Sequence, residues 1–306
     1  MSASGSTRAI LAALTANAGI AVAKFIGYAI TGSSSMLAEA VHSVADTSNQ
    51  ALLLLGQRRA KREATSLHQF GYGRSRFFYS FVVALVLFSL GAVFALYEGY
   101  RKIAEPHPLN SPFVAVGILV VAIGLESYSF RTAVVESRPL KGTGSWWQFI
   151  RRSRNPELPV VLLEDTGALL GLIFALVGVG LSMLTGNPVW DGIGTMLIGA
   201  LLAVIAVILM VEMHSLLIGE SATGEELAAI QSALEQTGHV ERVIHLRTQY
   251  LGPEEMLVAA KIALAPSTDL ATVAAAIDRA EAAVRAAVPA ATLIYIEPDL
   301  DRSLAR

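Results

Sequence analysis

Cysteine is absent from this chain of 306 residues. Disulfides, thiolate metal sites and cysteine-based catalysis are therefore excluded. Charged residues are also scarce, at 16% of the chain, whereas hydrophobic residues make up 54%. Such a composition is too apolar for an ordinary soluble domain and predicts a polytopic membrane protein. The formal net charge of −2 argues against a basic nucleic-acid-binding surface, so we expect no nucleic-acid partner.

Long apolar segments are the main feature that is present. Six of them are each long enough to cross about 30 Å of hydrocarbon. They cover roughly residues 9–30, 36–56, 77–100, 113–135, 159–184 and 189–218. The first is interpreted as an uncleaved span, because no basic start and cleavage site precede it. We therefore predict a transport-type domain of six transmembrane helices over residues 1–218, embedded in a lipid bilayer.

Basic residues are distributed unevenly between these segments. They gather in the second and fourth connections, whereas the first and fifth connections contain none. Because cytoplasmic connections carry the excess of lysine and arginine, this pattern places both termini in the cytoplasm. No long Arg- and Ser-rich transit peptide is recognisable, and we expect a bacterial cytoplasmic (inner) membrane location.

The composition changes to that of a soluble domain over residues 219–306. Hydrophobic periodicity predicts the order αββαβ, with elements at 225–236, 240–249, 256–264, 269–288 and 292–296. This order fits a small α+β, ferredoxin-like sandwich of a sheet and helices in the cytoplasm. A core of this size is small, so docking or dimerisation is expected to support it.

One pair of ionisable residues stands out in the second apolar segment. His42 and Asp46 are four residues apart, so a helix stacks them on one face. Ionisable groups are costly within a membrane and mark functional sites, and imidazole with carboxylate suits zinc. The alternative is a packing pair in which His42 is hydrogen-bonded to Asp46. A second acidic pair, Glu164 and Asp165 in the fifth segment, favours metal handling.

Other polar residues interrupt the apolar segments. Asn17 and Lys24 are unusual in lipid, so we expect them to face protein or an aqueous cavity. Glu39 lies three residues before His42, and Glu126 lies within the fourth segment. Asp191 begins the sixth segment, where it either caps that helix or lines an outer exit; the cap is favoured.

Together these features resemble the cation diffusion facilitator family. The resemblance rests on AEAVHSVAD at 38–46, the six spans, the acidic fifth helix and the αββαβ domain. HQFGYGR at 68–74 and LRT at 246–248 add to it. Within the family, the stretches most like the zinc transporter 9 branch are NP at 155–156, VVLLEDT at 160–166 and TGNP at 185–188.

The resemblance implies a secondary-active transporter, not an enzyme. It implies a homodimer that exports a cytoplasmic divalent cation, commonly Zn²⁺, in exchange for external protons by alternating access. Many members bind the ion with two ligands four apart on helix two and two four apart on helix five. His42 and Asp46 match the first pair, and Asp165 matches the second position of the other.

The remaining position of the implied site is Val161, which cannot coordinate a metal. Glu164 is the available substitute, although it is rotated by about 100° from Asp165 on an ideal helix. Two alternatives stay open for Glu164: it is either a metal ligand, or a proton carrier or interhelical hydrogen-bonding group. His42 favours Zn²⁺, Co²⁺ or Ni²⁺, whereas a carboxylate-rich shell with Glu164 would admit Mn²⁺ or Fe²⁺. No permanent cofactor is expected beyond the transported ion and protons.

Other metal positions of the family are not matched. In the soluble domain they fall at Ile244, Lys261 and Tyr295, none of which suits a divalent cation. We predict that this domain binds no metal and serves in dimerisation. Tyr72 stands where many members have histidine, which leaves His68 with a structural role in its loop.

Two rival functions remain at this point. One is an intramembrane zinc hydrolase in which His42, Asp46 and Glu164 activate water, although no HExxH motif supports it. The other is a non-transporting scaffold or regulatory homologue with a degraded site, which Val161 favours.

Overall fold

The computed structural model describes residues 3–108 and 111–300. The chain forms two compact units. One consists of Met1–Arg58 and Phe78–His214, and the other of Arg59–Phe77 and Ser215–Arg306.

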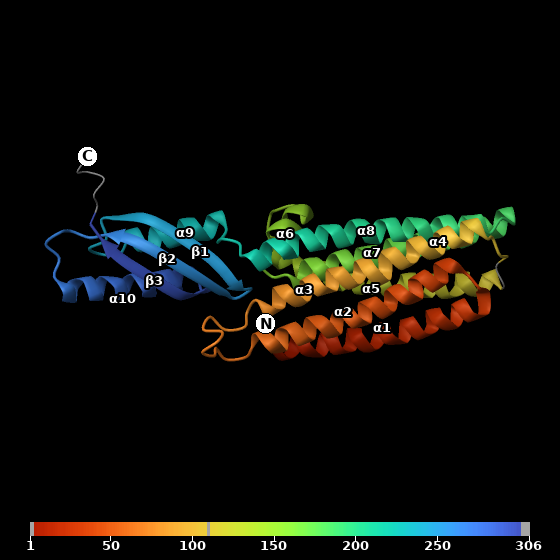
Figure 1. Cartoon of the computed structure of the whole chain (residues 1–306), viewed down its shortest axis with the longest axis horizontal. Helices are drawn as coiled ribbons and strands as arrows, with labels where there is room; N and C mark the ends of the chain where they lie inside the picture. Colours follow the sequence, from red (N-terminus) through yellow and green to blue (C-terminus); the bar gives the residue numbers. More distant parts are fainter. Residues whose placement is uncertain (1–2, 109–110, 301–306) are drawn as a thin grey trace. The chain divides into compact units, whose positions relative to one another are not determined.

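The first unit is a bundle of long helices (Figure 1). Each predicted apolar segment coincides with one of them, the third with a continuous run in which the π-helix η1 joins α3 to α4. The elements are α1 (Ala3–Thr31), α2 (Ser34–Ala60), α3 (Ser75–Val86), η1 (Leu87–Val93), α4 (Phe94–Ala104), α5 (Pro112–Lys141), α6 (Trp146–Arg152), α7 (Glu157–Thr185) and α8 (Val189–Ile218).

Four helical runs in the described part of the chain are long and apolar enough to cross a membrane. They are Ser75–Ala104, Pro112–Lys141, Glu157–Thr185 and Val189–Ile218. Together with the apolar composition, these runs make the chain an integral membrane protein.

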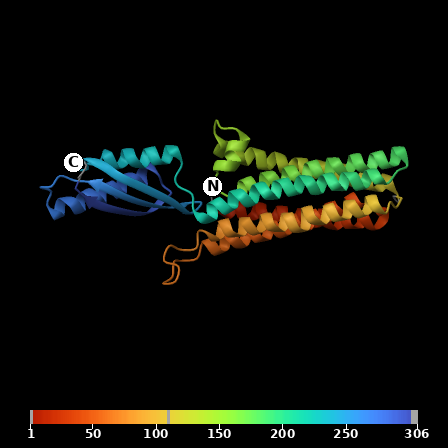
Figure 2. The same ribbon diagram turned by 45° about the horizontal axis from the view of Figure 1, so that its top comes forward.

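Helix α2 is more polar than these four runs and lies against several other helices. It is linked by hydrogen bonds to Lys24 of α1, Glu164 of α7 and Asp191 of α8. Its Gly56 lies so close to α3 that an added Cβ would come within 3.0 Å of the Tyr79 side chain. Helix α5 packs along α7 and α1 (Figure 2). Because its polar side chains face these neighbours, α2 keeps most of its ionisable groups away from lipid.

Asp191 is buried and caps α2, not the helix in which it lies. Its carboxylate accepts hydrogen bonds from the Ser34 backbone N–H at 2.9 Å and from the hydroxyls of Ser33 and Ser35 at 2.9 and 2.5 Å. The first N–H of α8 is bound instead by the Asn187 side chain, at 3.0 Å. The predicted cap of the sixth helix by Asp191 is therefore wrong. The physical reason is that the free N–H groups of α2 offer a carboxylate a stronger site across the bundle.

We expect Asp191→Ala to lower the stability of the bundle strongly. The change leaves buried N–H and O–H donors at the start of α2 without an acceptor, which costs about 2–4 kcal/mol. Thermal unfolding of the purified protein in detergent measures the effect. Asn187→Ala is the control, because its cap is exposed and its loss costs about 1 kcal/mol. Equal unfolding midpoints for the two variants would contradict the role assigned to Asp191.

The soluble part of the second unit has the predicted order αββαβ. Its elements are α9 (Gly224–Glu235), β1 (Arg242–Gly252), β2 (Glu255–Ala263), α10 (Leu270–Ala287) and β3 (Ala291–Asp299). Strand β2 is central, antiparallel to β1 and parallel to β3. Both helices begin within one residue of the predicted starts at 225 and 269. Thr223 forms a capping box with Glu226 at the start of α9, and Asp269 caps α10.

The core of this unit lies between the two helices and one face of the sheet. Buried side chains of α9 and α10 such as Ile230 and Val284 pack against Val258 of β2. Because side chains alternate along a strand, residues such as Ala259 and Tyr295 lie on the opposite face of the sheet. Among the residues that the structure describes, the core therefore leaves one face of the sheet without a covering helix.

Candidate metal centre

The centre of the candidate site is the pair that helical spacing predicted on α2. His42 is fully buried and Asp46 is 5% exposed. The His42 Nδ1 and Asp46 Oδ1 atoms are 3.4 Å apart. Within the described residues, however, both ring nitrogens of His42 and Oδ1 of Asp46 lack a hydrogen-bond partner. The pair is thus close but not hydrogen-bonded, which disfavours a simple packing role.

Helix α7 brings Glu164 to this pair. The Asn49 amide, one turn beyond Asp46 on α2, donates a hydrogen bond of 2.9 Å to Oε1 of Glu164. The carboxyl groups of Glu164 and Asp46 are close enough to interact directly. The side-chain oxygen of Asn49 has no hydrogen-bond partner among the described residues. An imidazole, two carboxyls and an amide oxygen therefore gather between α2 and α7.

Asp165 lies on another face of α7. It accepts a hydrogen bond of 3.2 Å from the Ser129 hydroxyl of α5. Val161, one turn earlier on the same face, packs beside Ala133 and Phe149 in an apolar cluster. The face of α7 that carries positions 161 and 165 is thus turned to α5, whereas Glu164 is turned to α2. The difference follows from helix geometry, because neighbouring residues point about 100° apart around the helix axis.

These side chains do not form a closed coordination shell. Within residues 3–108 and 111–300, no group of three or more His, Asp and Glu residues is arranged to hold a metal ion. The donors instead form two neighbouring pairs, His42 with Asp46 and Asn49 with Glu164. The number and type of donors suit a borderline divalent cation, with small shifts needed to converge on one ion.

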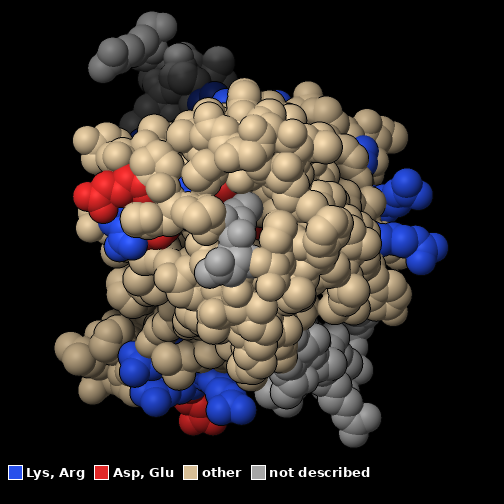
Figure 3. All heavy atoms as spheres, turned by 90° about the vertical axis from the view of Figure 1, so that its right-hand side faces the viewer, with Lys and Arg blue, Asp and Glu red and all other residues tan. Residues whose placement is uncertain are grey.

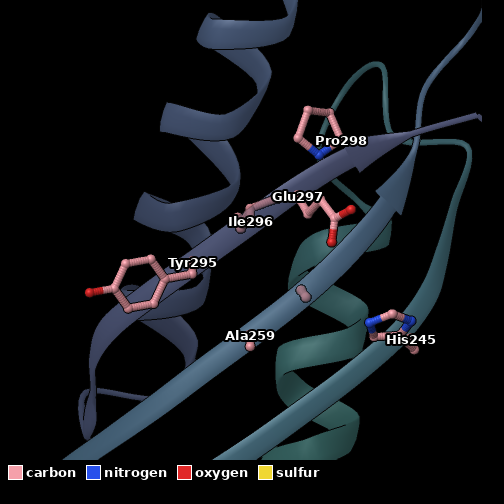
Figure 4. Close-up of a pocket in the computed structure, with 7 residues that line it drawn as sticks. His245, Ala259, Tyr295, Ile296, Glu297 and Pro298 are labelled. Carbon is pink, nitrogen blue, oxygen red and sulfur yellow. The ribbon is translucent and has the colours of Figure 1, made fainter.

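A second group of polar residues lies in the soluble unit, on the sheet face opposite α9 and α10. His245, Tyr295 and Glu297 line a hollow of about 430 Å³ there (Figure 4). Beside it, Lys261 contacts Glu297 at 2.7 Å and Asp299 at 3.2 Å. These hydrogen bonds raise the pKa of the Lys261 ammonium above its ordinary value. The Lys261 ammonium therefore already pairs with the carboxylates of Glu297 and Asp299. That this domain binds no metal stays a prediction.

The histidine of the loop before α3 also has a local partner. The rings of His68 and Tyr72 lie 4.6 Å apart, and His68 is exposed. Nearby in the same unit, Gly73 lies against the β1–β2 turn, where an added Cβ would come 2.8 Å from the Leu251 carbonyl oxygen. The ring contact agrees with a structural role for His68 in the loop.

Comparison with known proteins addresses the family directly. Residues 10–218 match the model of the cation efflux transmembrane domain, and residues 222–299 match that of the cation efflux protein cytoplasmic domain. The chain belongs to the cation efflux family. This confirms the family predicted from the motifs, and because its members are transporters and not enzymes, the hydrolase alternative is excluded.

Several curated relatives of this cation efflux protein are named for metal transport. It is 32% identical over 251 residues to the mitochondrial proton-coupled zinc antiporter SLC30A9 of both Mus musculus and Homo sapiens. Each alignment covers 81% of this chain but 44% of the relative, so the chain spans less than half of these antiporters. The zinc transporter ZitB of Pectobacterium atrosepticum is 27% identical over 83% of this chain and 75% of its own length. The predicted similarity to the zinc transporter 9 branch is confirmed.

Proposed function

We propose that this cation efflux protein exports a divalent cation, foremost Zn²⁺, from the cytoplasm in exchange for protons. One observation carries the proposal most directly. In the described residues, His42 and Asp46 hold buried nitrogen and oxygen atoms without hydrogen-bond partners, next to the Asn49–Glu164 contact. Unsatisfied buried donors and acceptors are costly, and a bound cation would satisfy these lone pairs.

Exchange with protons follows from the chemistry of the same groups. A metal ion binds neutral imidazole and ionised carboxylates, so protons compete for the same lone pairs. One site that faces each side of the membrane in turn can therefore carry the metal one way and protons the other. The relatives named as proton-coupled zinc antiporters support the proposed exchange of metal for protons.

We assign the primary ligand role to His42, Asp46 and Glu164. They come from α2 and α7, and Glu164 already interacts with Asp46 in this conformation. Asp165 is the fourth proposed ligand, which exchanges its contact with Ser129 for the ion when α7 rotates between access states. This arrangement accounts for Val161, because Glu164, the primary ligand on α7, faces α2 and does not lie on the face of α7 that carries Val161.

The proposal includes the membrane topology. Helices α1 and α2 add two spans to the four apolar runs, because the buried hydrogen bonds of α2 offset its polarity. Figure 3 views the bundle from the end where α2 and α8 begin, and this face is mostly uncharged. The lysine and arginine residues of the second and fourth connections favour a cytoplasmic side for those connections. We place the protein in a bacterial inner membrane with both termini inside.

Purified protein in liposomes tests the transport function. Zn²⁺ entry and proton movement are followed with dyes, and Mn²⁺, Co²⁺, Fe²⁺ and Ni²⁺ are added as competitors. We expect zinc-driven proton movement in the opposite direction, and none in protein-free liposomes. No flux for any of these metals would exclude the carrier and favour the non-transporting scaffold, which Val161 left open.

The soluble unit is proposed to be a ferredoxin-like dimerisation domain that binds no metal. Its matching family model is named for dimerisation, and in the described part of the chain one sheet face has no helix over it. We expect Tyr295→Lys, which adds charge to this face where Tyr295 is 57% exposed, to weaken the dimer by about tenfold or more. Light scattering of the full-length protein in detergent measures this. Leu270→Lys on α10 is the control, and an equal loss of dimer in both variants would contradict the assignment.

A further inference from the structure

Lys24 is a buried cation about two turns before the end of α1. Its side chain is 1% exposed, and its Nζ donates hydrogen bonds to Oε2 of Glu39 at 3.0 Å and to the Ser43 hydroxyl at 2.9 Å. Glu39 is itself fully buried. A buried ion pair costs desolvation on both sides, so it is weak evidence for stability and invites a functional explanation.

The ion pair lies beside the candidate metal centre. Glu39 is three residues before His42 and Ser43 is three before Asp46, so these side chains share neighbouring turns of α2. The Lys24 ammonium is close enough to act electrostatically on both His42 and Asp46. Any ion bound by His42 and Asp46 would therefore feel this fixed positive charge.

Glu39 is equipped to act as a ligand. Its Oε1 atom is buried and has no hydrogen-bond partner among the described residues. This oxygen lies against α7, where an added Cβ at Gly171 would come within 2.6 Å of it. The carboxylate thus reaches the same pair of helices, α2 and α7, that carry the candidate ligands, and only its other oxygen is bound by Lys24.

A second acidic group lies near Lys24. Glu126 of α5 is 5% exposed and interacts electrostatically with both Lys24 and Glu39. On the buried stripe of α5 it follows Ala122, which lines an apolar groove together with Lys24. Lys24 therefore faces carboxylates from two helices, and its charge offsets theirs.

We propose that Lys24 sets the affinity of the carrier by binding Glu39 and so keeping this carboxylate out of the metal's coordination shell. The inference rests on the proposed transport function. While Asp165 is held by Ser129, His42, Asp46 and Glu164 offer two negative charges to a divalent ion, which balances its charge. A third carboxylate would bind the ion more tightly and slow its release. Lys24 is in this sense a positioning residue, because it acts on the ion through Glu39.

The test compares Lys24→Met with the double variant Lys24→Met/Glu39→Gln. Methionine keeps the length and apolar stem of lysine without its charge. We expect the single variant to bind Zn²⁺ at least about tenfold more tightly, because a repelling charge is lost and Glu39 is freed. The double variant removes both charges, avoids an unpaired buried carboxylate and is expected to return to within about threefold of wild type. Zn²⁺ titration of full-length protein in nanodiscs gives the affinity.

Zinc flux into liposomes distinguishes the proposed role of Lys24 from a purely structural one, because a structural role would not lower KM. For Lys24→Met we expect KM and the maximal rate to fall together, because tighter binding slows release. Lys102→Met is the matched control: Lys102 is also buried, but its ammonium faces the Gly32 carbonyl oxygen at 3.5 Å. This control is expected to leave zinc affinity unchanged.

The outcomes separate the inference from the function on which it rests. A wild-type protein that neither binds nor transports Zn²⁺ would overturn the proposed function and the inference with it. Wild-type transport with unchanged or weaker Zn²⁺ binding in Lys24→Met would overturn the inference alone. If Lys24→Met does not fold, the zinc affinity of the double variant Lys24→Met/Glu39→Gln tests the inference instead. A large loss of zinc affinity in the double variant would show that Glu39 or Lys24 belongs directly to the metal site, and would refute the inference.

Discussion

Asp46→Asn is expected to reduce zinc transport by about 100-fold or more. Asparagine keeps the shape of the side chain but removes the negative charge that a divalent ion requires. Even changes to groups that merely support metal ligands cost about 10–100-fold in affinity or activity, so loss of a direct ligand should cost at least as much. Initial rates of zinc uptake into liposomes, at equal amounts of reconstituted protein, measure the effect.

Asp278→Asn provides the matched control for this variant. It makes the same chemical change on the exposed side of α10 and should leave transport unchanged. Thermal unfolding should show that Asp46→Asn is folded, since Oδ1 of Asp46 has no hydrogen-bond partner to lose among the described residues. Transport by Asp46→Asn at more than about a third of the wild-type rate would remove Asp46 from the site.

Glu164→Gln is expected to weaken zinc binding about 100-fold, and Asp165→Asn about tenfold or less. The difference reflects where the two carboxylates point, because Glu164 meets Asn49 of α2 and Asp165 meets Ser129 of α5. Zinc titrations of the two variants in nanodiscs measure it. The two substitutions are neighbours in sequence and chemically alike, so each serves as the control for the other.

The reverse order of effects would contradict the ligand assignment. If Asp165→Asn lost most of its zinc affinity and Glu164→Gln bound normally, the ion would lie between α2 and the other face of α7. Glu164 would then keep only its interhelical hydrogen bond with Asn49. Comparable large losses in both variants would instead show that both carboxylates contact the ion at once.

Much of the architecture could be predicted because it follows from local patterns. The long apolar runs gave the helices of the bundle, and alternation with turn residues gave the αββαβ order of the soluble unit. The spacing of His42 and Asp46 placed them on one helical face, 3.4 Å apart between Nδ1 and Oδ1. Each of these features is determined within a few turns of chain, where propensity and periodicity are informative.

Long-range partners could not be predicted in the same way. The carboxylate of Asp191 is 157 residues from the Ser34 N–H that it binds. Its partner therefore lies on another helix, which local sequence patterns do not reveal. Lys24 was expected to face protein, but no local pattern pointed to Glu39. Both contacts depend on which helix faces lie together, and this is decided by packing across the bundle.

The sequence by itself determined the family, the long apolar helices and the His42–Asp46 pair that α2 brings to the candidate site. Only the tertiary structure decided which carboxylate of the Glu164–Asp165 pair meets those donors. Neighbouring residues on a helix differ by about 100° in direction, so the rotation of α7 about its own axis decides which of the two carboxylates faces α2. That rotation is fixed by contacts such as Val161 in its apolar cluster and Asp165 with Ser129, which turn Glu164 towards α2.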